Sequence, residues 1–262
     1  MRVIVTRPEH EAGPWVSGLQ AAGHETRVWP LIELGPVADP RPLQAAWQRW
    51  SQWQAVMFVS AQAVRHFFAL QPAAAQAHDG PRCWATGPGT QRALQAAGVA
   101  AQRIDTPSAA SAQFDSEALW QQVGAQVHTD APVLIVRGAD AAPGALTGEP
   151  QGQGRDWLGQ QLQARGVPVQ WLAAYERRCP RWHEDQCHAA RLAARDGSVW
   201  LCSSSQALQH LQRLLPETDW SHARALATHA RIGQTATALG FGQVRCTRPL
   251  LDEVLASLES FA

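Results

Sequence analysis

The chain has 262 residues, 45% of them hydrophobic and 17% charged, so it is long enough to bury one large core or two modest ones. Its basic and acidic side chains balance at 22 each, which argues against a nucleic-acid or membrane-surface partner. All of the basic residues are arginines, so lysine-dependent Schiff-base chemistry and a phosphate-loop lysine are excluded. No apolar run approaches the roughly 20 residues that cross a bilayer, and we expect a soluble, cytoplasmic protein.

Cysteine and histidine give no sign of a metal centre. The five cysteines are scattered and include no Cys-x-x-Cys pair, which argues against a disulfide framework or a zinc ribbon. The ten histidines form no His-Glu-x-x-His motif and no compact cluster with carboxylates. We therefore expect no metal.

Short apolar runs alternate with longer helical patterns along the chain, and most are bounded by Gly, Pro or Ser. The intervening helices end in glycine signals such as Ala22-Gly23 and Ala97-Gly98. This alternation predicts an α/β fold with mostly parallel sheets covered on both faces. In chain order, the predicted strands are Val3–Thr6, Glu25–Ile32, Ala55–Ser60, Arg82–Thr86, Gln102–Thr106, Pro132–Arg137, Pro168–Arg177, Ser198–Ser203, Ala223–Thr228 and Gln243–Thr247.

One stretch stands apart from this alternation. Gly138–Gly154 is rich in Gly, Ala, Pro and Gln and has little to bury. It predicts a flexible surface loop.

The two halves of the chain resemble each other at a nearly constant offset. Residues 60–67 align with residues 204–211, and the serine, glutamine, alanine and histidine of the two segments are identical. Two further matches keep the same order and nearly the same offset, which indicates a duplication and hence two similar domains. These matches pair Trp15, Leu19 and Gly23 with Leu158, Leu162 and Gly166, and Ala85, Thr86 and Gly98 with Ala227, Thr228 and Gly240.

Ligands of open parallel sheets bind beyond the carboxyl ends of the strands, where helix N-termini present free N–H groups. Small hydroxyl residues follow four of the predicted strands, and their recurrence in both halves favours a single cleft that binds carboxylates. Serine and threonine are also preferred helix caps, so capping alone remains an alternative. The hydroxyl residues are Ser60, Thr86, Ser203 with Ser204, and Thr228.

Three further residues lie at strand ends. Arg7 and Arg137 either assist anion binding or are simply solvated strand ends. Tyr175, the only tyrosine, either packs there or donates a proton to a leaving hydroxyl.

Along nearly its whole length the chain resembles the uroporphyrinogen-III synthase family. Each motif is loose, but their order and spacing are specific. The segments that carry the resemblance are Val5-Thr6-Arg7-Pro8, residues 58–64, Ala85-Thr86-Gly87 through to Gly98, residues 133–138, residues 154–158 with Leu162 and Gly166, Tyr175-Glu176-Arg177-Arg178, Ser203-Ser204 and residues 229–233.

The resemblance implies two flavodoxin-like, doubly wound domains joined by two crossing strands, near Pro30–Gly35 and Val169–Arg177. Residues 1–34 and 173–262 would form the first domain and residues 35–172 the second, with Tyr175 facing the cleft between them.

The activity implied is cyclisation of hydroxymethylbilane to uroporphyrinogen III with inversion of the last pyrrole and loss of water, by a monomer without a cofactor. Tyr175 would assist departure of the hydroxyl. The implied substrate-binding residues are Arg7, Ser60, Ala61, Thr86, Gly87, Arg137, Gly138, Ser203, Ser204, Thr228, His229 and Arg231.

Two alternatives stay open from the residues alone. A non-catalytic, two-lobed binder of an anionic small molecule would show the same paired α/β domains and helix starts. A sugar-phosphate isomerase fits the fold but lacks a convincing acid/base cluster.

Overall fold

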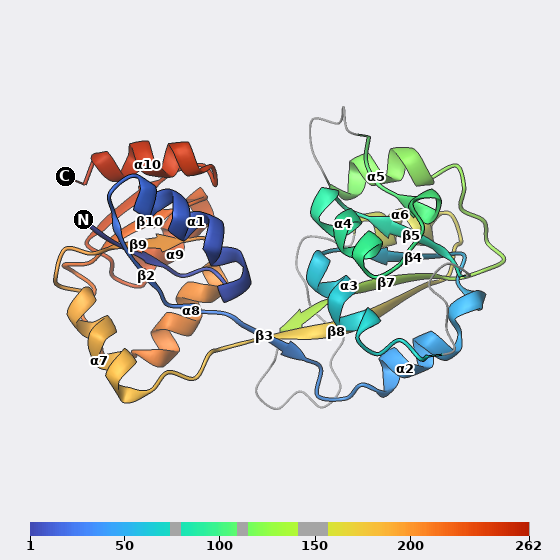
Figure 1. Ribbon diagram of the computed structural model, residues 1–262, viewed down its shortest axis with the longest axis horizontal. Coiled ribbons are helices and arrows are strands. Elements are labelled where there is room, and N and C mark those ends of the chain that lie inside the picture. Colours follow the sequence, from blue (N-terminus) through green and yellow to red (C-terminus); the bar gives the residue numbers. More distant parts are fainter. Residues whose placement is uncertain (74–79, 109–114, 141–156, 262) are drawn as a thin grey trace. The chain divides into compact units, whose positions relative to one another are not determined.

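The computed structural model describes residues 1–73, 80–108, 115–140 and 157–261. They divide into two compact units, Met1–Leu34 with Arg178–Ala262 (unit 1) and Gly35–Arg177 (unit 2). In each unit, helices cover the sheet on both faces (Figure 1). The boundary expected at residues 172–173 falls inside strand β8 (Val169–Arg178), and the units divide at its end.

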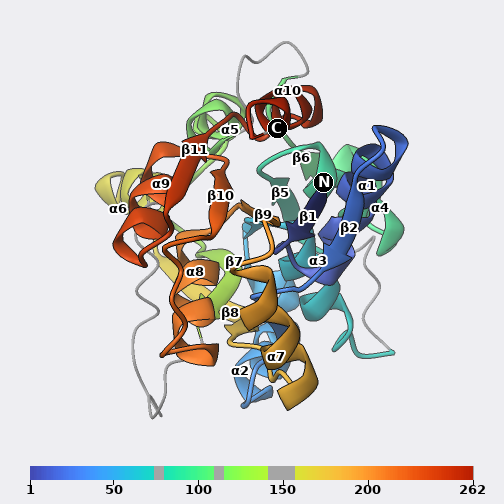
Figure 2. The same cartoon turned by 90° about the vertical axis from the view of Figure 1, so that its left-hand side faces the viewer.

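Unit 1 contains a five-stranded sheet in the order β11-β10-β9-β1-β2, which Figure 2 shows side by side. All neighbouring strands are parallel. Counted along the unit's own chain, the order is 2-1-3-4-5, which is that of flavodoxin-like sheets. The strands are β1 (Arg2–Val5), β2 (Glu25–Val28), β9 (Val199–Cys202), β10 (Arg224–Ala227) and β11 (Gln243–Cys246).

Strand β1 shows why this sheet carries helices on both faces. Val3 and Val5 pack with α1 (Glu9–Ala21) and α10 (Leu251–Glu259), whereas Ile4 packs with α7 (Glu184–Ala193), α8 (Ser205–Leu214) and α9 (Ala230–Ala238). Successive side chains of a strand point to opposite faces, so an unbroken apolar run is buried on both sides. Each such side chain contributes about 1.5–3 kcal/mol on burial.

Unit 2 contains a six-stranded sheet in the order β3-β8-β7-β4-β5-β6. Strands β8-β7-β4-β5-β6 take the places of β2-β1-β9-β10-β11, although the chain of unit 2 passes from β3 to β4 and reaches β7 only later. The segments that align in sequence therefore occupy equivalent places in the two sheets, which supports the duplication. The remaining strands are β3 (Glu33–Pro36), β4 (Ala55–Phe58), β5 (Arg82–Ala85), β6 (Ile104–Asp105) and β7 (Val133–Asp140).

The two faces of this sheet are covered by different helices. Met57 packs with α5 (Ser116–Val123) and α6 (Trp157–Ala164). The next residue, Phe58, lies against Phe67 of α3 (Ala61–Phe68), with ring centroids 5.5 Å apart. The other elements are α2 (Arg41–Gln48), α4 (Pro88–Ala96) and the 3-10 turns η1 (Trp50–Gln52) and η2 (Ala101–Arg103).

Three predicted elements need correction. The strand expected at Glu25–Ile32 ends at Val28, which pairs with the last residue of β1, Val5, and a separate strand, β3, begins at Glu33 in the sheet of unit 2. The strand expected from Gln102 begins only at residue 104, because residues 101–103 form the turn η2. Strand β7 runs three residues past its expected end at Arg137, so the loop predicted at residues 138–154 starts as strand; residues 141–154 lie outside the described part of the chain.

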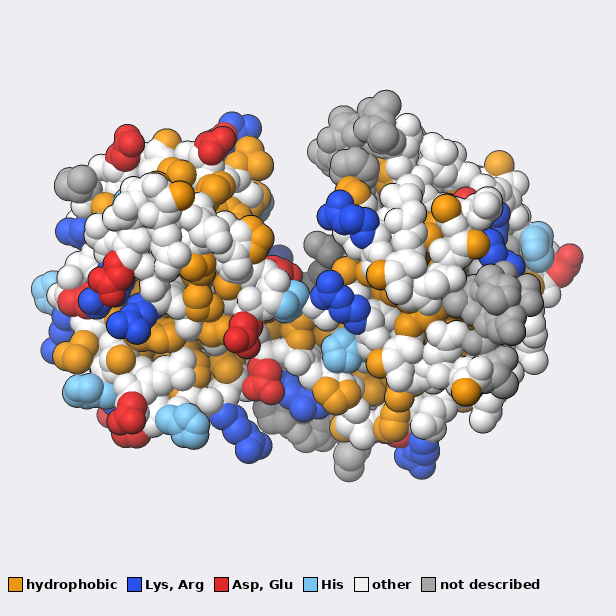
Figure 3. All heavy atoms as spheres, viewed as in Figure 1, with side chains coloured by type: hydrophobic (Ala, Val, Ile, Leu, Met, Phe, Trp, Pro, Cys, Tyr) orange, Lys and Arg blue, Asp and Glu red, His pale blue; other side chains and the backbone are white. Residues whose placement is uncertain are grey.

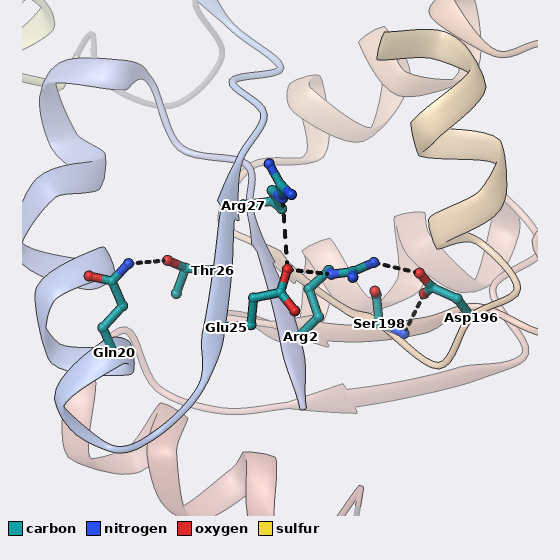
Figure 4. A network of polar contacts seen from close by, with 7 residues as sticks. All are labelled: Arg2, Gln20, Glu25, Thr26, Arg27, Asp196 and Ser198. Atoms are coloured by element: carbon teal, nitrogen blue, oxygen red, sulfur yellow. Dashed lines mark hydrogen bonds and ion pairs between the residues drawn. The ribbon is translucent and has the colours of Figure 1, made fainter. Parts of the chain in front are cut away.

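The amino edge of the unit 1 sheet is occupied by charges that pair with one another (Figure 4). Arg2 donates to Glu25 at 3.0 Å and to Asp196 at 2.7 Å, and Asp196 also accepts from the backbone N–H of Ser198 at 3.0 Å. These groups already satisfy one another. A ligand is therefore to be sought at the opposite, carboxyl edge.

The charged surface agrees with the zero net charge. On the face in Figure 3, arginine and acidic side chains lie interspersed among uncharged ones.

None of the helices in the described ranges has the length and apolarity to cross a membrane.

Candidate functional site

Each sheet has one place where two neighbouring strands lead on to strands on opposite sides of the pair, through helices that pack on opposite faces. In unit 1 this place lies between β1 and β9, since α1 and α8 belong to different cores. In unit 2 it lies between β4 and β7, which are followed by α3 and α6. Crevices at such switch points are the usual ligand sites of doubly wound sheets. The residues at these two points are Thr6, Arg7, Ser203 and Ser204 in unit 1, and Ser60, Ala61, Arg137 and Gly138 in unit 2.

Ser60 starts helix α3 and also reaches the tyrosine. Its backbone is extended (φ −162°, ψ 161°), and its Oγ accepts a hydrogen bond from the N–H of Ala63 at 3.1 Å. The same Oγ lies 3.4 Å from the hydroxyl of Tyr175, and either oxygen can be the donor. One side chain thus caps the helix and contacts the only phenol of the chain.

Gly138 makes room for this contact. Tyr175 in β8 stands opposite Gly138 in β7, where the register shifts between Arg137 and Gly138. A Cβ at Gly138 would lie 2.6 Å from Cε2 and 2.8 Å from the hydroxyl of Tyr175. The bare glycine therefore lets the ring lie across β7 and reach the end of β4. Tyr175 is only 6% exposed there.

His66 is a site residue that the sequence analysis did not single out. Its ring stacks on Tyr175 with a centroid separation of 5.5 Å and an interplanar angle of 26°. Burial lowers the pKa of the half-buried imidazole, so the ring is neutral at neutral pH. The only available signal was that this histidine is identical in the two duplicated segments.

Thr86 and Gly87 follow β5, the neighbour of β4. The Thr86 hydroxyl donates to the carbonyl of Val59 at 3.3 Å, which ties the two strand ends together. Gly87 is the extended residue before α4, whose first residue is Pro88. Because proline has no N–H, that helix start offers one donor fewer to a ligand.

In unit 1, two residues lie at the end of β1. The buried hydroxyl of Thr6 donates to the carbonyl of Leu201 at 2.7 Å and closes the switch point between β1 and β9. The Arg7 guanidinium pairs with Glu11 at 3.5 Å and lies 4.5 Å from the ring centroid of Trp15. Burial lowers its pKa, and Glu11 opposes that shift. Arg7 is thus held along helix α1.

The remaining unit 1 candidates surround the starts of α8 and α9. Ser204 caps α8, accepting from the N–H of Ala207 at 3.4 Å, and His229 caps α9 through Nδ1, which accepts from the N–H of Arg231 at 3.2 Å. Thr228 is only 7% exposed. Capping is therefore part of the explanation for Ser60, Ser204 and His229 alike.

The structure gathers the candidates into two sets. Ser60, Ala61, Gly138 and Tyr175 meet at the carboxyl edge of unit 2, with Arg137 next to Gly138 and with Thr86 and Gly87 at the neighbouring strand end. Arg7, Ser203, Ser204, Thr228, His229 and Arg231 lie at the carboxyl edge of unit 1. In the ranges that the structure describes, no group of three or more His, Cys, Asp or Glu side chains could hold a metal ion.

Fold and sites together define a two-unit, flavodoxin-like α/β protein whose switch points carry hydroxyls and helix N-termini, groups that bind anions in other proteins. A family model described as "Uroporphyrinogen-III synthase HemD" matches residues 14–255. The chain therefore belongs to the uroporphyrinogen-III synthase family, whose members are cyclising enzymes of tetrapyrrole biosynthesis.

Individual relatives align with nearly the whole chain. Uroporphyrinogen-III synthase of Escherichia coli is 27% identical over 94% of both chains, and that of Synechococcus elongatus is 29% identical over 99% of this chain and 95% of its own. Among solved structures, uroporphyrinogen-III synthetase of Helicobacter pylori aligns over the full length of both chains with a TM-score of 0.59 at 15% identity. A mutant uroporphyrinogen III synthase of Thermus thermophilus aligns over 100% of this chain and 98% of its own, with a TM-score of 0.53 at 13% identity. The predicted family and fold are confirmed, and the non-catalytic binder is not favoured.

Proposed function

We propose that this protein converts hydroxymethylbilane, a linear tetrapyrrole rich in carboxylates, into uroporphyrinogen III. Family membership supports the reaction class. The observation that carries the assignment of the site is the contact of Tyr175 with Ser60 above Gly138, at the switch point of unit 2. There a phenol hydroxyl lies at a helix start that suits an anionic substrate.

The reaction proceeds by loss of the terminal hydroxyl of the substrate. The hydroxyl leaves with a proton as water and creates an azafulvene-type cation. Attack by the substituted carbon of the last pyrrole gives a spiro intermediate, which fragments and recloses with that ring inverted. The ring carbon that forms the final bond loses a proton, so one water is released overall. Nothing is oxidised or reduced, and the proposed activity requires no cofactor.

Tyr175 assists the first step. A phenol can donate a hydrogen bond to the departing hydroxyl and so stabilise the charge that develops on it. Ser60 is the only partner that the described structure gives the phenol oxygen, at 3.4 Å, which is long for an O–H···O bond. The phenol can therefore turn its proton towards substrate without breaking a strong bond.

The carboxylates of the substrate are bound by backbone N–H groups and side chains that follow the ends of strands. The first N–H groups of a helix have no intrahelical partner, and each contact with an anion there contributes about 0.3–1 kcal/mol. The proposed contacts come from Arg7, Ser60, Ala61, Thr86, Gly87, Arg137, Gly138, Ser203, Ser204, Thr228, His229 and Arg231. Holding the long substrate in one geometry would supply much of the rate.

The test is to add the purified protein to enzymatically made hydroxymethylbilane, oxidise the products and separate the porphyrin isomers. Spontaneous closure without protein gives the type I isomer and sets the baseline. The proposal expects the type III isomer to dominate. Type I alone would refute it, and saturable binding without type III product would favour a non-catalytic binder.

We further propose that the enzyme acts as a monomer in the cytoplasm. All five cysteines are free, which suits a reducing compartment. Light scattering after size exclusion tests the first part, and a mass of twice the 28.5 kDa chain would refute it.

A further inference from the structure

The hydrogen bond that Tyr175 makes cannot by itself hold its ring in place. The Ser60 contact is 3.4 Å long, and Ser60 Oγ is already engaged with the N–H of Ala63. A bond of this length orients a phenol weakly. The position of the ring must therefore be set by what packs against it.

Among the residues that surround the buried ring, Gly138 and His66 bear directly on its position. Gly138 leaves space at Cζ, Cε2 and the hydroxyl, and this permits the observed position without enforcing it. His66 makes a stacked contact, with centroids 5.5 Å apart and planes at 26°. Of these two contacts, only the one from His66 adds an attractive surface.

Helix α3 places two of the groups that contact the tyrosine. Ser60 stands at its start and His66 lies in its last turn, so one rigid element contacts both the hydroxyl and the ring. Tyr175 arrives from β8 on the far side of β7. The neutral state of His66 at neutral pH suits this place, because a fixed positive charge would oppose the cation that forms on the substrate.

We propose that His66 is a positioning residue that holds the phenol of Tyr175 over Gly138 with its hydroxyl at Ser60. The role rests on the proposed function of Tyr175, through which His66 acts. Aromatic pairs favour their stacked arrangement by about two- to tenfold. Loss of the imidazole is therefore expected to lower kcat by about that factor and to leave KM nearly unchanged.

The single tyrosine of the chain gives a direct measurement. Protein labelled with 13C at tyrosine Cζ shows one resonance, that of Tyr175. His66→Ala is expected to move this resonance towards the position of free tyrosine and to lower kcat. His66→Phe, which keeps a flat ring, is expected to restore both. His188→Ala, at an exposed histidine of α7, is the matched control and should change neither.

A double variant separates this role from that of Tyr175 itself. If His66 acts through the phenol, His66→Ala adds no further loss of turnover in a Tyr175→Phe background. An additional several-fold loss there would overturn the proposal, as would a Tyr175 resonance unmoved by His66→Ala. Full turnover in Tyr175→Phe alone would instead remove the proposed role of Tyr175, while the resonance would still report whether His66 packs on it.

Discussion

At Gly138 a methyl group would lie closer to the Tyr175 ring than Cβ atoms in real structures come, at 2.6 Å from Cε2. Both residues sit in paired strands, so neither backbone can move aside easily. We expect Gly138→Ala to lower the free energy of unfolding by about 1–3 kcal/mol, as overpacking does, and to reduce turnover by displacing the phenol. Urea unfolding and the isomer assay measure the two effects.

Gly13 offers the matched control for this substitution. It lies inside helix α1, and a Cβ there would meet no atom within 4 Å. Gly13→Ala should raise the free energy of unfolding by about 0.5–1 kcal/mol, because alanine is the better helix former. Equal effects of the two substitutions would mean that the Tyr175 ring is not confined by Gly138.

Tyr175→Phe removes one oxygen and leaves the ring. Within the described part of the chain, the hydroxyl has one hydrogen-bond contact, the long one with Ser60, so we expect the free energy of unfolding to change by less than about 1 kcal/mol. Turnover is expected to fall about 10- to 100-fold, which is no more than the low end of what a general acid contributes, because the phenol donates a hydrogen bond to the departing hydroxyl. Steady-state kinetics at matched folded fractions checks this. Unchanged turnover would remove Tyr175 from the mechanism.

At the scale of elements, Ser60 has two functions at the start of α3: it caps the helix and it contacts the phenol of Tyr175. Two substitutions separate these functions. Ser60→Ala removes both the cap and the phenol contact, and should cost about 1 kcal/mol of unfolding free energy as well as turnover. Ser60→Gly should cost only a few tenths of a kcal/mol, because glycine is tolerated at helix starts, while turnover still falls. Thermal unfolding and kinetics on both variants test the distinction.

Ser204 provides the internal control for this pair. It caps the equivalent helix α8, and no hydrogen bond from its side chain to a tyrosine is found in the described structure. Ser204→Ala should show the same loss of stability as Ser60→Ala. If Ser60→Gly kept full turnover, Ser60 would be a cap and nothing more.

Much of the strand pattern follows from local sequence, and its errors lie at the ends of strands. Each predicted strand has a counterpart because apolar runs between helical patterns mark strands buried on both faces. The run from Glu25 to Ile32 looked like one strand, but its pairing with β1 ends at Val28, and β3, which begins at Glu33, belongs to the other sheet. Residues 101–103 form a 3-10 turn that the sequence pattern did not predict.

The candidate site was predictable only where it depends on single elements. Ser60 and Ser204 follow from the rule that ligands and caps gather where a strand passes into a helix. The meeting of Tyr175 with Gly138 depends on the β7–β8 register and on its shift at Arg137, which no local pattern encodes. The His66 stack depends on that same register, so it was missed for the same reason.

At the scale of the whole molecule, duplication has kept the architecture and changed the use of its parts. His66 and His210 are the equivalent histidines of α3 and α8. His210 is buried and its Nδ1 lies 2.7 Å from the carbonyl oxygen of Leu31, whereas His66 is half-buried and stacks on Tyr175. In one copy the histidine, His210, makes a hydrogen bond to the backbone of Leu31, just before the chain passes from unit 1 to unit 2. In the other copy the histidine, His66, contacts the candidate catalytic group, Tyr175.

At the scale of the whole chain, two buried cysteines are expected to govern how the free energy of unfolding changes at high pH. Burial raises the pKa of Cys83 and of Cys202 to about 12 from an ordinary value of 9.0. The folded state therefore keeps protons that the unfolded chain loses above about pH 9, so the free energy of unfolding should fall as pH rises from there. The slope is at most about 1.4 kcal/mol per pH unit for each thiol. With no lysine and a single tyrosine, few other side chains titrate in this range.

Urea unfolding at half-unit steps from pH 8 to pH 10.5 measures this slope. Cys83→Ala combined with Cys202→Ala should flatten it, although filling each thiol site with a smaller side chain lowers the starting stability. Cys246→Ala removes an exposed thiol of the same sheet that holds Cys202, and it should leave the slope unchanged. If the double variant kept the wild-type slope, the loss of stability in alkali would have to come from groups other than the two buried thiols.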